Sequence, residues 1–284
     1  MNFWNIDTEK SFFTEAMKNF ASPEQLFYKL TDGYFAYVPK GKNAERQTLQ
    51  SRNSLIGQYT EKWCKDFFQP IAEGLGLFAV NSVVCPELGL TNQSDADLAF
   101  CTTKETLQKA ENIKLLFEIK MSIVNNYKFE KDQVNFIGDY KTHKGNPSIL
   151  RSDSMLKAIG KSINIRVSGT KSAKIPIIIL GNSPITKNYS KKVDFLKKTG
   201  IIQSFISLYP NPTIDFIKNT DGKGFQTFNE YQNLTNYITE VVKSDMNFFS
   251  SMLPKRKLGQ IITASAKEKD DVSKAEKFLN LINE

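Results

Sequence analysis

The sequence has 284 residues, of which 40% are hydrophobic and 24% are charged, so the chain can bury a sizeable core. No apolar run is long enough to cross a membrane, and the first residues lack the basic and apolar regions of a signal peptide. The formal net charge of +8 is compatible with a polyanionic partner without establishing one. Three cysteines without C-x-x-C spacing predict reduced thiols in a cytoplasmic protein, not a zinc site.

The first part of the chain is predicted to be helical. Phe13, Ala16 and Met17 recur at helical spacing within residues 8–20, and Ser22-Pro23-Glu24-Gln25 has the residues of a helix start. A longer helix is predicted at about 51–69. Its apolar stripe consists of Ile56, Tyr59, Trp63 and Phe67.

Strands and helices alternate in the remainder of the chain. Strands are predicted at about 77–85, 96–102, 112–124, 174–180 and 201–208. Helices are predicted at about 151–166, with Ser152 as its cap, and at 190–198, 231–242 and 267–282. The buried stripe of the first of these helices is expected to be Met155, Leu156, Ile159 and Ile163. This order predicts an α/β fold with a central mixed β-sheet flanked by helices.

The chain is predicted to form a single domain over residues 1–284, because it shows no internal repeat and no Pro/Ser-rich linker. The core is expected at about 51–182. Helical extensions are expected at 1–50 and 212–284. Pro176 argues against a fully central position for the strand at 174–180.

Acidic and basic side chains interrupt two of the apolar strands. Because side chains alternate between the faces of a strand, Glu118 and Lys120 share one face, and Asp95 and Asp97 share one face of the preceding strand. Burying such charges is costly without a partner, so their position in apolar strands suggests a shared site. Neighbouring strands would bring these groups together, where carboxylates can hold a divalent cation that activates water.

This arrangement resembles the PD-(D/E)xK nucleases, and among them the type II restriction endonucleases, over about residues 51–182. The resemblance implies that Asp97 or Asp95 binds Mg²⁺ together with Glu118, and that Lys120 contacts the attacking water or the scissile phosphate. The family often has Pro before the aspartate, whereas this chain has Ala96 before Asp97 and Ser94 before Asp95. Asp97 is preferred because Leu98-Ala99-Phe100 continues it as a strand.

The resemblance further implies sequence-specific cleavage of double-stranded DNA by a homodimer, with a cognate DNA methyltransferase as a functional partner. A DNA repair or structure-selective nuclease is an alternative. A non-catalytic nucleic-acid-binding module on the same fold is another.

Weaker candidates surround this group. Glu61, on the helix at 51–69, is where such nucleases often add a carboxylate, and Glu45 and Arg52 are less specific candidates near it. The predicted DNA-phosphate contacts are Arg151, Lys157, Lys161, Lys191 and Lys192. His143, the only histidine, is expected on the surface, because it lies in a polar loop between lysines.

Overall fold

The computed structural model describes residues 2–19, 21–44, 49–209 and 217–283. The chain divides into two compact units, Met1–Met246 and Asn247–Glu284. The first unit contains both β-sheets, whereas the second consists of a short helical hairpin.

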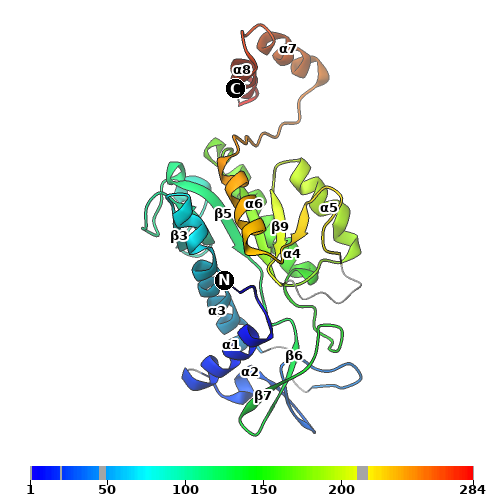
Figure 1. Cartoon of the computed structure of the whole chain (residues 1–284). Coiled ribbons are helices and arrows are strands. Elements are labelled where there is room, and N and C mark those ends of the chain that lie inside the picture. Colours follow the sequence, from blue (N-terminus) through cyan, green and yellow to red (C-terminus); the bar gives the residue numbers. More distant parts are fainter. Residues whose placement is uncertain (1, 20, 45–48, 210–216, 284) are drawn as a thin grey trace. The chain divides into compact units, whose positions relative to one another are not determined.

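A mixed sheet of six strands forms the centre of the first unit (Figure 1). Its strands are β3 (Phe78–Val83), β4 (Ala96–Cys101), β5 (Ile113–Ile119), β8 (Ile177–Gly181), β9 (Ser204–Ser207) and β10 (Phe225–Thr227). The spatial order is β10-β9-β8-β5-β4-β3, with antiparallel pairing from β3 to β5 and parallel pairing from β5 to β10. The predicted α/β class with a helix-flanked mixed sheet is thereby confirmed. The sheet continues beyond residue 182, the expected end of the core.

Helices cover both faces of this sheet, because its middle strands are apolar on both sides. On one face α3 (Gln50–Gly74) and α6 (Tyr231–Lys243) pack on the sheet, and the rings of Phe68 and Phe117 lie 5.0 Å apart. On the other face lie α4 (Ser152–Val167) and α5 (Lys187–Lys198), which bury Met155 and Val193. The central strand β8 begins directly after Pro176, so the proline lies outside the strand and does not exclude it from the middle of the sheet.

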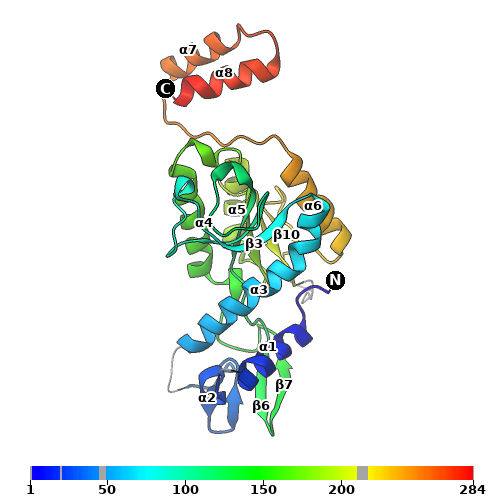
Figure 2. The same cartoon turned by 90° about the vertical axis from the view of Figure 1, so that its left-hand side faces the viewer.

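A second, antiparallel sheet has the order β1-β2-β6-β7, built from β1 (Tyr28–Leu30), β2 (Gly33–Phe35), β6 (Asn126–Glu130) and β7 (Gln133–Gly138). The helices α1 (Ile6–Asn19) and α2 (Pro23–Leu26) belong to the same part, where Phe13 stacks on Phe27 at 4.7 Å. The N-terminal segment therefore contributes strands as well as the expected helices. The long helix α3 extends from this sheet to the central one (Figure 2).

Two predicted elements differ in detail from the structure. The strand expected at 112–124 ends at Ile119, and the chain then crosses to the second sheet. Arg151, not Ser152, occupies the N-cap position of α4, without a capping side-chain hydrogen bond, and the buried side of α4 passes through Met155, Ala158 and Ile165. Leu156 and Ile163, expected in the buried stripe, are 61% and 42% exposed.

The second unit contains α7 (Lys255–Ser265) and α8 (Asp271–Asn283). The two helices pack against each other, Ile261 of α7 is buried, and Phe249 meets Phe278 edge to face at 5.6 Å. In the described part of the chain, no helix is both long and apolar enough to cross a membrane.

Candidate active site

Two carboxylates face each other across the pair β4 and β5. The antiparallel register pairs Leu98 with Phe117, which puts Asp97 opposite Glu118. The backbone N–H of Ile119 donates a hydrogen bond of 2.6 Å to Asp97 Oδ2, so Asp97 is anchored to the end of β5. The Glu118 residue is 7% exposed.

Two lysines neutralise this pair from different elements. Lys120 Nζ lies 2.5 Å from Glu118 Oε1 and 3.8 Å from Asp97 Oδ2. Lys161 Nζ, which reaches in from α4, lies 2.6 Å from Glu118 Oε2 and 3.2 Å from Asp97 Oδ1. Lys161 Nζ contacts one oxygen of each acid, so these two oxygens can be no farther apart than the sum of the two distances. Their separation therefore does not exceed ~6 Å, the upper end of the range expected for two carboxylates that share one cation.

Burial and neighbouring charges together determine the pKa of Glu118. Desolvation raises the pKa of Glu118, the adjacent Asp97 raises it further, and the ammonium groups of Lys120 and Lys161 oppose this rise. For Lys161, burial lowers the pKa, but the negative charges of Asp97 and Glu118 outweigh this effect and the net pKa is raised. The lysine therefore stays charged between the two acids.

Glu61 places a third carboxyl in the same electrostatic environment, from α3. Burial raises the pKa of Glu61 to about 7, and Asp97 and Asp95 add to the rise. The part of this rise that comes from Asp97 and Asp95 is a charge repulsion, which a bound cation would relieve.

A network of buried polar groups holds the end of β5 in place. The Ser148 hydroxyl donates to the Lys120 carbonyl at 2.5 Å and accepts from the Asn182 backbone N–H at 3.0 Å. The Asn182 amide accepts from the Ser122 N–H at 3.0 Å and donates to the Ser122 carbonyl at 2.6 Å. Residues 120–122 are thus bound by side chains, which positions Lys120 and ends the strand.

The oxygens of this site suit a hard cation. Among the described residues, no group of three or more His, Cys, Asp and Glu side chains is arranged to hold a metal ion. Asp97 and Glu118 nevertheless present carboxylate oxygens. The Ile119 carbonyl oxygen lies near them, because Lys120 Nζ, which contacts both acids, also contacts this oxygen at 3.1 Å. Mg²⁺ binds oxygen ligands, keeps several waters and needs only one or two carboxylates, so this set fits it.

Of the two candidate aspartates, the structure brings Asp97 into the cluster. Asp97 contacts both lysines and the Ile119 N–H, whereas Asp95 precedes β4 and acts on Glu61 through its charge.

The predicted phosphate contacts lie in different settings. Lys161 was expected to face DNA, but its side chain lies inside the carboxylate cluster and is 18% exposed. In the structure it lies three residues after the buried Ala158 and four before the buried Ile165, on the side of α4 that faces the sheet. Arg151 and Lys157 are exposed and pair with Asp153 at 3.4 and 3.1 Å. Lys191 and Lys192 are exposed on α5.

Glu45, another candidate, lies outside the described residues. Two further candidates do not join the site. Arg52 is buried, and its guanidinium donates to the Ala36 carbonyl. His143 is also buried, not on the surface as predicted: it is 2% exposed and stacks on Tyr37 at 4.0 Å.

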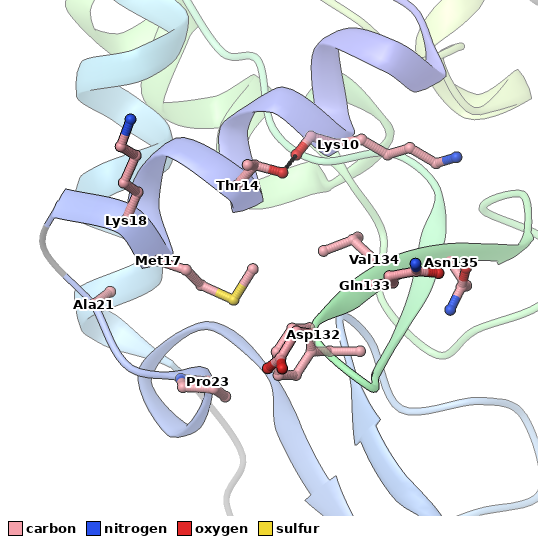
Figure 3. Close-up of a pocket in the computed structure, with 11 residues that line it drawn as sticks. Lys10, Thr14, Met17, Lys18, Ala21, Pro23, Asp132, Gln133, Val134 and Asn135 are labelled. Atoms are coloured by element: carbon pink, nitrogen blue, oxygen red, sulfur yellow. Dashed lines mark hydrogen bonds between the residues drawn. The ribbon is translucent and has the colours of Figure 1, made fainter.

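A pocket of about 700 Å³ lies between α1 and the β6–β7 hairpin (Figure 3). Lys10 and Lys18 of α1 and Asp132 and Asn135 of the hairpin are among its lining residues. None of the carboxylates or lysines of the cluster lines it. The pocket is therefore separate from the candidate active site.

A comparison with known proteins found no match: no family model, no curated protein and no solved structure is significantly similar to the chain. Its chemistry must therefore be inferred from the site itself.

Proposed function

We propose that this protein is a Mg²⁺-dependent endonuclease of the type II restriction type, which hydrolyses phosphodiester bonds at a specific sequence of double-stranded DNA. The observation that carries the proposal is the meeting of Asp97, Glu118 and Lys120 where β4 begins and β5 ends, on strands that are otherwise apolar except for the exposed Lys114. Such a group of charges does not improve packing, because burying a charged side chain costs free energy that burying an apolar side chain does not.

Each residue has a chemical task in this proposal. Asp97 and Glu118 would hold the cation, with the Ile119 carbonyl as a further oxygen ligand. A bound Mg²⁺ supplies an acidified water and neutralises charge on the phosphate. Lys120, fixed by the Ser148 network, orients the attacking water or stabilises the charge that develops on the scissile phosphate. Glu61, whose pKa is about 7 in the ion-free protein, would be the carboxyl suited to exchange a proton near the site.

The proposed substrate agrees with the charge of the chain. The net charge of +8 favours a polyanion, and Arg151, Lys157, Lys191 and Lys192 provide exposed positive charge for phosphates. A palindromic DNA site has two-fold symmetry, so a homodimer is the form expected to cut both strands. A DNA methyltransferase of the same specificity is the expected functional partner.

The proposal is tested by incubating supercoiled plasmids with the protein in Mg²⁺ or in EDTA and sequencing the ends of the products. A restriction-type enzyme produces discrete fragments whose ends share one sequence, and only with Mg²⁺. Cuts without a common sequence would instead indicate a repair or structure-selective nuclease. Retarded but intact plasmid in a gel would indicate a binding module without catalysis.

A further inference from the structure

Lys161 and Lys120 together occupy the oxygens of both carboxylates. Lys161 contacts Asp97 Oδ1 and Glu118 Oε2, and Lys120 contacts the other oxygen of each acid. A divalent cation bound by Asp97 and Glu118 needs oxygens from the same set. Cation binding therefore competes with at least one of these ion pairs.

The two lysines differ in how firmly they are held. Lys120 follows Glu118 directly along the chain, and its backbone is fixed by the Leu180 carbonyl at 2.7 Å and by Ser148. Its ammonium also contacts the Ile119 carbonyl at 3.1 Å, a contact that is not among those described for Lys161. Lys161 reaches across from α4 on a long flexible side chain, and the contacts described for its ammonium are with the two acids. Lys161 is therefore the lysine that a cation displaces.

We propose that Lys161 is a gate for the cation: its ammonium competes with a divalent ion for Asp97 and Glu118, and ion binding releases it. The inference rests on the proposed function only for the presence of a cation at these carboxylates. The gate keeps the acids neutralised in the ion-free protein, where two adjacent buried carboxylates would otherwise repel each other. It also predicts that cation affinity is set partly by a residue that does not bind the cation.

The direct test is Mn²⁺ binding to the full chain in the absence of DNA, measured by electron paramagnetic resonance. Lys161→Met removes the competing charge and should tighten Mn²⁺ binding about tenfold or more. The matched control is Lys157→Met, one helical turn away and paired with Asp153, which should bind Mn²⁺ as the wild type does. Equal or weaker Mn²⁺ binding by folded Lys161→Met would overturn the gate.

Lys161→Gln provides a second variant in case Lys161→Met does not fold, because it keeps a hydrogen-bond donor toward the acids. Release is measured separately on the wild type, by mass spectrometry after labelling with an amine-reactive ester. Labelling of Lys161 should rise on addition of Ca²⁺ while that of Lys157 stays constant; unchanged labelling of Lys161 contradicts release.

These outcomes separate the gate from the proposed function. Tighter Mn²⁺ binding by Lys161→Met without any DNA cleavage by the wild type would retain the gate and reject the nuclease. Cleavage by the wild type with unaltered Mn²⁺ affinity in Lys161→Met would retain the nuclease and reject the gate. Failure of wild type and variant alike to bind Mn²⁺ would reject both.

Discussion

Asp97, Glu118, Lys120 and Lys161 form two acid–base pairs in a largely buried space, where charges are stable only in partnership. The strand pattern predicted three of them, because alternation puts Glu118 and Lys120 on one face and antiparallel pairing brings Asp97 opposite. The fourth, Lys161, comes from a helix more than 40 residues later. Its meeting with the acids depends on how α4 packs on the sheet, which the local pattern does not specify.

Asp97 and Asp95 can be ranked by mutation. Asp97→Ala should lower cleavage at least ~100-fold, because it removes a cation ligand and the anchor of the Ile119 N–H. Asp95→Ala should have a milder effect, since the interaction described between Asp95 and the site is that of its charge with Glu61. Single-turnover cleavage rates measure both. The opposite ranking would assign the cation ligand to Asp95.

Glu61 should make stability depend on pH. Its pKa rises from 4.5 in a free side chain to about 7, so the folded protein binds this proton more tightly than the unfolded chain. The free energy of unfolding should therefore fall as pH rises from about 4.5 to about 7 and be level above.

Glu61→Gln removes this dependence and should raise the free energy of unfolding at pH 8 by about 2 kcal/mol relative to wild type, with little effect at pH 4. Urea unfolding at both pH values, in EDTA, measures the difference. Asp66→Asn, an exposed change on the same helix, is the control. Equal stabilisation at pH 4 and pH 8 would contradict a raised pKa for Glu61.

Among the elements, β5 shows where the sequence pattern fails. Alternation of apolar residues continues from Ile113 to Val124, which predicted one long strand, yet the strand ends at Ile119. The cause lies in distant residues, since Ser148 and Asn182 bind the backbone of residues 120–122 and direct it out of the central sheet. The second sheet could not be predicted for a similar reason: it pairs β2 with β6, far apart in the chain.

Helix α1 is fixed to the second sheet by a buried carboxylate. Glu9 is 0% exposed and accepts five hydrogen bonds, from Trp4, from the N–H groups of Val124 and Asn125, and from the side chains of Asn125 and Tyr127. All five partners are donors, so the ionised carboxylate satisfies them and an amide cannot.

Glu9→Gln should therefore lower the free energy of unfolding by about 2–4 kcal/mol, because buried donors lose their acceptor. Urea unfolding measures the loss, and Glu15→Gln, exposed on the same helix, should change it by less than ~0.5 kcal/mol. Equal effects of the two substitutions would show that the Glu9 network contributes little to stability.

The net charge of the whole molecule offers a test of the proposed DNA binding. If positive side chains contact phosphates, affinity should fall steeply with salt, because each neutralised phosphate releases condensed counterions. Charge reversal at Lys191 and Lys192 should weaken binding to all sequences about equally and reduce the salt slope. Fluorescence anisotropy in Ca²⁺ at several salt concentrations measures both. A loss confined to one sequence would instead identify these lysines as base-reading residues.

The central claim is that Asp97 and Glu118 serve phosphodiester hydrolysis, and plasmid cleavage by Glu118→Gln tests it most directly. The amide has nearly the shape of the acid but cannot bind Mg²⁺ as a carboxylate does, so cleavage should fall at least ~1,000-fold. DNA binding in Ca²⁺ and the circular dichroism spectrum serve as checks that the variant is folded. Glu111→Gln, an exposed substitution just before β5, should cleave like the wild type in the same assay. Mg²⁺-dependent cleavage by the wild type that is lost only in Glu118→Gln is the predicted result, and undiminished cleavage by folded Glu118→Gln would contradict the claim.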